Sequence, residues 1–217
     1  MKIRTDIQQG TLEWLSARAG IVTASEFGEF LTNDLKPRTG EMRKSYIARK
    51  VAERIFGPLP SHNTLDMDLG KILEEEAIPW FEFEKGLKVD RPGFVTSDDG
   101  MAGCSPDGLI VAGNIGLEIK CPRPETHIGY LLKMASSVKD ETARDWFPPH
   151  YAPQVLGSMS VTGLRDWVFV SYCRKLPPLV ARIFWGDWKK EIAQVEACLA
   201  DMVLEIETET AKVKKMK

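Results

Sequence analysis

Cysteine and histidine are scarce in this sequence, which limits the metal and disulfide chemistry that it can carry. The 217 residues include four cysteines and three histidines. No two cysteines form a C-x-x-C pair, and the histidines lack the spacing of metal ligands. Zinc and iron–sulfur sites are therefore not expected, and scattered thiols favour a reducing compartment, so we expect a cytoplasmic protein. These residues are Cys104, Cys121, Cys173, Cys198, His62, His127 and His150.

Long hydrophobic runs and an excess of charge of one sign are also missing. No apolar run is long enough to cross a bilayer, and residues 1–6 lack the apolar core of a signal peptide. The formal net charge of −2 argues against a protein that coats DNA over its whole surface. Basic residues do gather between Arg38 and Lys50, where they form either a local nucleic-acid surface or a solvated helix face. With 43% hydrophobic and 28% charged residues, the chain is typical of a soluble globular domain.

Apolar periodicity and turn residues predict a mixture of helices and strands. The predicted helix at 23–31 opens with a capping-box pattern, in which Thr23 and Glu26 bond to the backbone at the helix start. Free amides at such a start can bind a phosphate group. Helices are expected over residues 11–18, 23–31, 40–56, 65–84, 126–135, 149–161 and 187–210, and strands over 87–96, 166–173 and 179–185.

The most informative stretch runs from Cys104 to Cys121. Asp107 stands at the head of one apolar run, and Glu118 and Lys120 lie inside a second. The turn residues 112–114 separate the two runs, so the stretch is typical of a β-hairpin.

Side chains alternate along a strand, which gives the charged residues of this hairpin a common direction. Glu118 and Lys120 share one face, Leu117 and Ile119 take the other, and Asp107 can converge on the charged pair. Buried charge is unfavourable unless it is paired or binds a metal. Carboxylate oxygens suit magnesium or manganese, and a nearby lysine can orient water or stabilise charge on a phosphate. The alternative is an exposed hairpin that carries these charges on a solvated face.

Two motifs in this stretch resemble a known enzyme family. Pro106-Asp107, ten intervening residues and Glu118-Ile119-Lys120 resemble the PD-(D/E)XK nuclease signature. The longer strings at residues 104–109 and 116–122 resemble the lambda-type (YqaJ-like) phage and viral recombination exonucleases. The resemblance also includes residues 18–26 and 70–74, and it weakens after about Gln154.

The resemblance implies an α/β fold with a restriction-endonuclease-like core, in which helices flank a central mixed β-sheet. It implies one domain over residues 1–217, with a helical part at about 1–86, a sheet-bearing catalytic core at about 87–186 and a closing helix at about 187–214. The activity it implies is processive 5′-to-3′ digestion of double-stranded DNA. Such an enzyme releases 5′-mononucleotides and leaves 3′ single-stranded overhangs for phage recombination by strand annealing.

The resemblance also implies a metal site. Asp107 and Glu118 would hold one or two magnesium (or manganese) ions, together with the backbone carbonyl of Ile119. Lys120 would orient or activate the attacking water. Helical periodicity lets either Glu74 or Glu76 point inward, and the Gly-Lys-x-x-Glu match favours Glu74 as a third carboxylate that acts through water.

Several residues are implied as DNA contacts. Arg18 would bind the 5′-phosphate with support from Ser25, although without the resemblance its position favours a surface arginine. Ser105 would position the scissile phosphate or simply bond within its turn, and Gln154 matches a glutamine that binds DNA or supports the site. Related enzymes carry an arginine after the Lys-Cys-Pro step, where this chain has Thr126, with Arg123 and His127 nearby. The second phosphate contact is therefore open, and Arg123 is a candidate.

The implied partners are double-stranded DNA ends, further copies of the chain in a ring-shaped homotrimer, and a phage single-strand annealing protein. The implied location is the cytoplasm of a bacterial host, with a phage or prophage gene and no membrane contact. A structure-selective or site-specific endonuclease, a catalytically silent DNA-end binding module and a small-molecule metallohydrolase are alternatives. Nicking of closed circular DNA would identify the endonuclease, and magnesium-dependent nucleotide release would exclude the other two.

Overall fold

The strands form two mixed sheets in the computed structural model, which describes residues 1–60, 65–110, 113–137 and 143–216. Within these residues, the first sheet has four strands and the second has five. The first has the order β1 (Lys2–Arg4), β4 (Phe94–Thr96), β5 (Ala102–Cys104) and β2 (Val22–Thr23). The second has the order β3 (Val89–Asp90), β6 (Gly108–Ile110), β7 (Ile115–Lys120), β8 (Asp166–Ser171) and β9 (Leu179–Phe184).

Strand β7 is central in the second sheet and carries the charged face that the sequence predicts. It pairs antiparallel with β6, which confirms the hairpin, and parallel with β8. Ala112 of the predicted turn lies outside the described residues. Leu117 and Ile119 are buried in a cluster with Ala77, Ile78 and Phe81 of helix α3 (Leu65–Lys85), so α3 covers the apolar face of β7.

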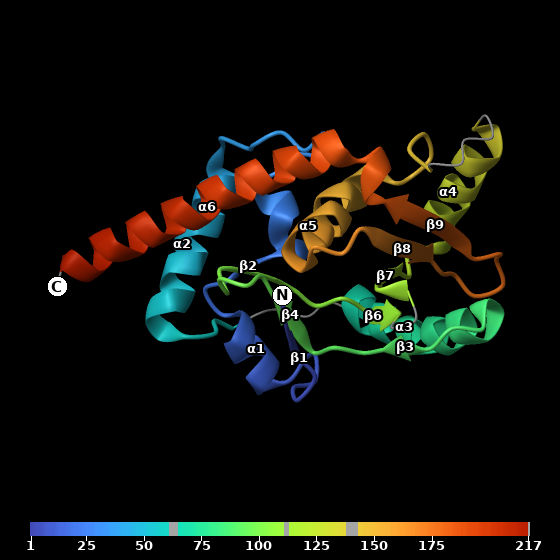
Figure 1. The fold of residues 1–217 in the computed structure, drawn as a ribbon, viewed down its shortest axis with the longest axis horizontal. Coiled ribbons are helices and arrows are strands. Elements are labelled where there is room, and N and C mark those ends of the chain that lie inside the picture. Colours follow the sequence, from blue (N-terminus) through green and yellow to red (C-terminus); the bar gives the residue numbers. More distant parts are fainter. Residues whose placement is uncertain (61–64, 111–112, 138–142, 217) are drawn as a thin grey trace.

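Helices cover the remaining faces (Figure 1). Helix α5 (Ala152–Thr162) packs against β5, β8 and the 3-10 helix η1 (Ala24–Glu29). Gly157 permits this approach, since a Cβ atom there would lie 2.5 Å from the ring of Phe27. Helix α6 (Lys189–Lys215) lies across α5 and α2 (Glu41–Phe56). The other helices of the described residues are α1 (Leu12–Arg18), α4 (Pro124–Ser136) and the short 3-10 helices η3 (Pro149–Tyr151) and η4 (Trp185–Asp187).

The predicted fold class is confirmed, and three local predictions are corrected. The single strand expected over 87–96 is two strands, β3 in the second sheet and β4 in the first. The N-terminal part is not purely helical, because β1 and β2 join the first sheet. The segment expected as a capped α-helix at 23–31 forms the six-residue 3-10 helix η1. The Thr23 hydroxyl donates to Oε2 of Glu26 at 2.8 Å rather than capping the backbone. This short element does not provide the phosphate-binding helix start that the pattern predicted.

Candidate active site

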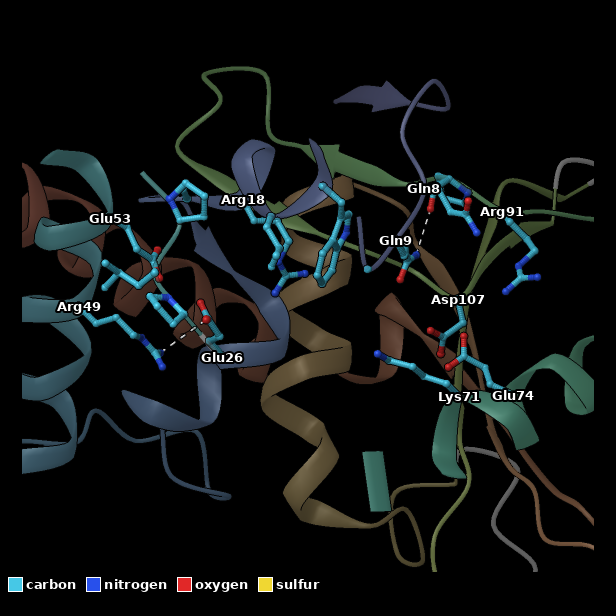
Figure 2. Close-up of a pocket in the computed structure, with 18 of the residues that line it drawn as sticks. Gln8, Gln9, Arg18, Glu26, Arg49, Glu53, Lys71, Glu74, Arg91 and Asp107 are labelled. Carbon is cyan, nitrogen blue, oxygen red and sulfur yellow. Dashed lines mark hydrogen bonds and ion pairs between the residues drawn. The ribbon is translucent and has the colours of Figure 1, made fainter. Parts of the chain in front are cut away.

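A cavity of about 1020 Å³ lies between helices α1, α2 and α3 and the loop that carries Asp107. One end, called here the acidic end, is lined by Asp107 and Glu74. Arg18 lines the middle, and Glu26 and Glu53 line the far end (Figure 2). The cavity therefore joins the predicted metal ligands to the predicted phosphate contact.

Asp107 is fixed to β7 by the backbone. The Ile119 N–H donates to Oδ2 of Asp107 at 2.5 Å, and the Asp107 N–H donates to the Leu117 carbonyl at 3.1 Å. Glu74 reaches the same carboxylate from α3 and shares a hydrogen bond with it. Glu76, the other candidate on α3, pairs instead with Arg174 on the surface. The structure therefore brings Glu74 to Asp107 and turns Glu76 away.

Glu118 is 1% exposed and is held by two donors. Lys120 Nζ lies 2.5 Å from its Oε1 atom, and the side-chain amide of Gln154 donates to the same oxygen. The Lys120 ammonium also lies 5.8 Å from the ring centroid of Tyr151. Strand alternation puts Glu118 and Lys120 side by side, and α5 adds Gln154 from a segment far along the chain.

Burial and mutual repulsion shift the ionisation of these groups. Burial and the charge of Glu74 raise the pKa of Asp107 to about 7. Burial raises the pKa of Glu118 to about 7, although Lys120 opposes the shift. Burial also raises the pKa of Glu74. Burial lowers the pKa of Lys120, but the charges of Glu118 and Asp107 outweigh this effect and raise it overall, so Lys120 is an ammonium at neutral pH.

The donor atoms at the acidic end fit a hard divalent cation. In the described part of the chain, no three histidine, cysteine or acidic side chains are already arranged as a metal-binding cluster. The set considered for a metal is different, because it combines the buried carboxylate of Glu118, the half-buried carboxylate of Asp107, a backbone carbonyl and the Glu74 carboxylate that bonds to Asp107. All these donors are oxygens, and like charges held together in a buried site favour a counter-cation. Asp107, Glu118, the Ile119 carbonyl and Glu74 are the residues that would hold it.

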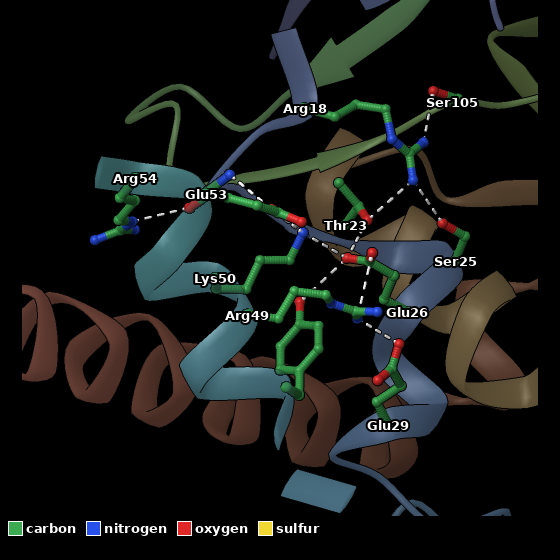
Figure 3. A network of polar contacts seen from close by, with 12 residues as sticks. Arg18, Thr23, Ser25, Glu26, Glu29, Arg49, Lys50, Glu53, Arg54 and Ser105 are labelled. Carbon is green, nitrogen blue, oxygen red and sulfur yellow. Dashed lines mark hydrogen bonds and ion pairs between the residues drawn. The ribbon is translucent and has the colours of Figure 1, made fainter. Parts of the chain in front are cut away.

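Arg18 is the centre of a polar cluster in the middle of the cavity (Figure 3). Its guanidinium donates to the hydroxyl oxygens of Ser105 at 3.2 Å, Thr23 at 3.2 Å and Ser25 at 3.1 Å. The structure thus brings together three predicted phosphate contacts, Arg18, Ser25 and Ser105, from separate segments.

Trp14 belongs to this cluster, although its sequence position suggested only an apolar helix face. Its indole N–H donates to the Ser105 hydroxyl at 2.8 Å, and the Arg18 guanidinium lies 4.2 Å from its ring centroid. Trp14 and Arg18 are four residues apart on α1, which is the spacing that brings helix side chains into contact. From this spacing alone the contact between Trp14 and Arg18 could have been predicted.

Lys50 anchors the far end of the cavity and is 2% exposed. Its ammonium lies 2.8 Å from Oε2 of Glu26 and 2.8 Å from Oε2 of Glu53. Glu53 also accepts from the Gly20 N–H at 2.9 Å, so the network ties α2 to the loop after Arg18 (Figure 3). Of the two alternatives for this basic segment, the solvated helix face is therefore wrong for Lys50.

Two further cations, Arg91 and Lys71, line the acidic end. The Arg91 guanidinium bonds both carboxylate oxygens of Glu75, at 2.8 and 2.6 Å. These bonds raise the pKa of Arg91, and the charges of Glu74 and Asp107 add to the effect. No sequence motif marks Arg91, which follows a two-residue strand.

The residues near the missing family arginine lie elsewhere. His127 is fully buried, with Nδ1 2.7 Å from the Ser171 hydroxyl and Nε2 3.0 Å from the Pro177 carbonyl oxygen. Arg123 is exposed at the start of α4 and is not among the residues that line the cavity. Neither residue lines the cavity that Arg18 and Asp107 share.

Known proteins resemble this chain in sequence and in structure. The family model described as the YqaJ-like viral recombinase domain matches residues 13–165. The crystal structure of an alkaline exonuclease (LHK-Exo) from Laribacter hongkongensis is similar over 95% of this chain and 100% of its own, with 29% identity and a TM-score of 0.71. The structure of LHK-Exo in complex with dAMP is similar over the same shares, with 30% identity and a TM-score of 0.71.

A phage-related exonuclease from Haemophilus somnus shares the fold, with a TM-score of 0.61 at 12% identity over 91% of this chain and 96% of its own. No curated protein sequence matches the chain. Among the described residues, no helix combines the length and apolar character needed to cross a lipid bilayer.

Proposed function

The chain belongs to the YqaJ-like viral recombinase family, and from this premise we propose that it is a metal-dependent exonuclease that digests double-stranded DNA from the 5′ end. The observation that carries the proposal is that Asp107, which is hydrogen-bonded to the strand of the Glu118–Lys120 ion pair, lines a cavity that continues to the Arg18 cluster. Asp107, Glu118 and Lys120 can cleave a phosphodiester, and the Arg18 cluster can hold a terminal phosphate. The dAMP bound to the similar alkaline exonuclease is a deoxynucleoside monophosphate, the class of product expected here.

The chain's own residues supply positioning and charge. Lys120, as an ammonium, orients the attacking water and offsets charge that develops on the phosphate. Gln154 fixes the Glu118 carboxylate, and the Ile119 N–H fixes that of Asp107. A bound magnesium or manganese ion supplies positive charge that offsets the carboxylates and stabilises the phosphate in the transition state.

The Arg18 cluster gives the proposed direction. A guanidinium backed by the hydroxyls of Ser25 and Ser105 offers charge-assisted hydrogen bonds to a dianionic terminal phosphate. A 5′-phosphate held there would leave the first phosphodiester beside the carboxylates. Each cleavage would then release one 5′-mononucleotide, and the complementary strand would remain as a 3′ single-stranded overhang.

Assembly and partners are part of the same proposal. A homotrimeric ring around DNA would keep a chain of net charge −2 on its substrate, because enclosure replaces a uniformly basic surface. A phage annealing protein in the host cytoplasm would then bind the exposed strand. Analytical ultracentrifugation tests the ring, since a monomer at micromolar concentration would contradict it.

The function is tested with linear, 5′-phosphorylated duplex and magnesium, with each strand labelled separately. The 5′-ended strands should shorten with release of mononucleotides, while covalently closed circular duplex stays intact. Lys120→Ala should slow cleavage about a thousandfold while DNA binding persists, and Lys133→Ala on exposed α4 is the matched control. A nicked circle would instead indicate an endonuclease. End binding without nucleotide release, with magnesium or manganese, would indicate a silent binding module.

A further inference from the structure

The ion pair between Arg91 and Glu75 lies at the acidic end of the cavity (Figure 2 shows Arg91 beside Asp107 and Glu74). Arg91 directs both terminal nitrogens at Glu75, with distances of 2.8 and 2.6 Å. A planar guanidinium that holds a carboxylate in this way presents the geometry that also binds two oxygens of a phosphate group. The pair therefore places a phosphate-shaped donor beside the proposed cleavage site.

This pair is easily exchanged. The Arg91 side chain is 48% exposed and that of Glu75 is 62% exposed. Ion pairs between exposed side chains contribute little free energy. The carboxylates of the cleavage site, together with a DNA phosphate beside them, would attract the guanidinium more strongly than the single solvated carboxylate of Glu75 does.

The acidic end also needs positive charge from the protein. Asp107, Glu74 and Glu75 all line it, and together they repel an entering phosphodiester. Arg91 and Lys71 are the arginine and lysine side chains that line this end within the described residues, apart from the Arg18 cluster. Of the two, Arg91 is the one already held in a two-pronged contact.

We propose that Arg91 binds a backbone phosphate of the DNA strand that enters the acidic end, and that Glu75 occupies Arg91 until DNA displaces it. Arg91 is thus a substrate-binding residue, and Glu75 is a competitor that weakens binding. This inference rests on the proposed function, because it assigns a further DNA contact to the same cavity.

The two partners should change DNA affinity in opposite directions, which a purely structural ion pair would not do. Dissociation constants are measured by fluorescence anisotropy with a short 5′-phosphorylated duplex and calcium in place of magnesium. Arg91→Ala should weaken binding about fivefold to twentyfold and lower the slope of log affinity against log salt by about one. The dissociation constant of Arg91→Lys should lie between those of the wild type and Arg91→Ala. Glu75→Gln should tighten binding about twofold to fivefold.

The structure offers a matched control pair, whose glutamate lies next to Glu75 on α3. Arg174 and Glu76 also form a two-pronged ion pair at similar exposure, but neither lines the cavity. Arg174→Ala and Glu76→Gln should leave the dissociation constant within about twofold. The double variant Arg91→Ala with Glu75→Gln separates competition from general charge removal, because the tightening by Glu75→Gln should disappear when Arg91 is absent.

Each other result overturns the inference. Equal weakening by Arg91→Ala and Glu75→Gln would make the pair structural, and unchanged affinity in both would remove it from DNA binding. If Glu75→Gln still tightens binding when Arg91 is absent, Glu75 acts only through its negative charge and does not compete for Arg91. Wild-type protein that neither binds nor digests duplex DNA would overturn the proposed function as well, whereas normal digestion with an unaffected Arg91→Ala variant would reject this inference alone.

Discussion

The side-chain amide of Gln154 donates a hydrogen bond to the same oxygen of Glu118 that Lys120 contacts. Helix α5 therefore sets the orientation of the central carboxylate of β7, from 36 residues further along the chain. Two donors on one oxygen fix the carboxylate more strictly than the neighbouring lysine alone. Gln154 is thus placed to tune a bound cation without being a ligand.

Removal of the Gln154 amide should therefore weaken the affinity of the proposed metal site for magnesium before it abolishes activity. Gln154→Ala is expected to raise the magnesium concentration for half-maximal digestion about tenfold, since partners of metal ligands contribute on this scale. The measurement is initial rate against magnesium concentration. Gln194→Ala on α6 is the control, and an unchanged half-maximal concentration in Gln154→Ala would contradict this role.

Arg18 should determine the preference for phosphorylated ends. Arg18→Ala is expected to lower kcat/KM on a 5′-phosphorylated duplex about tenfold to a hundredfold, the range of a lost charge-assisted contact. The same variant should digest a 5′-hydroxyl duplex nearly as well as wild type does. The ratio of the two rates is the measurement, and Arg182→Ala on β9 should leave it unchanged. A ratio that survives in Arg18→Ala would remove Arg18 from end recognition.

Asp107 should reduce stability in the absence of metal, because burial and Glu74 raise its pKa to about 7 and its charge is unfavourable above that pH. Asp107→Asn keeps an oxygen for the Ile119 N–H and removes the charge. At pH 8 in EDTA it is expected to be more stable by about 1 to 3 kcal/mol, or about 3 to 8 °C in Tm.

Magnesium should raise the Tm of the wild type and leave that of Asp107→Asn almost unchanged. Differential scanning fluorimetry with and without magnesium measures both effects. A variant that melts below wild type in EDTA would show that the carboxylate stabilises the fold.

Lys50 should stabilise the protein in a pH-dependent way. Burial raises the pKa of Glu26, but the charge and hydrogen bond of Lys50 lower it by more than burial raises it, so the net shift is downward. A carboxylate with a lowered pKa contributes stability that is present above its unfolded pKa and is lost as the pH falls through the folded value.

Lys50→Met leaves Glu26 and Glu53 without their shared cation. It is expected to lower the free energy of unfolding by about 2 to 4 kcal/mol at pH 7, and by less at pH 4. Urea denaturation at the two pH values measures the difference. Lys44→Met, on the same helix with a side chain that is 71% exposed, should change stability little at either pH. Equal destabilisation by Lys50→Met at both pH values would mean that lost packing, rather than charge, is responsible.

Local pattern was sufficient for the elements that carry the chemistry. Period-two alternation predicted that Glu118 and Lys120 share a face opposite Leu117 and Ile119, and apolar runs predicted most helices. These features depend on residues within a few positions of each other, where strand and helix geometry is fixed by the backbone. The family resemblance added the fold class, which the structure and its relatives confirm.

The sequence alone therefore determined which charged residues lie together on the hairpin and which class of fold contains it. Tertiary structure decided the rest: the division into two sheets, the choice of Glu74 over Glu76, and the burial of Lys50. It also decided the contact of Gln154 with Glu118 and the position of Arg91 at the acidic end. These outcomes depend on which distant segments pack together. Helix periodicity gives each side chain a direction on its own element, but only the packed chain shows what that side chain meets.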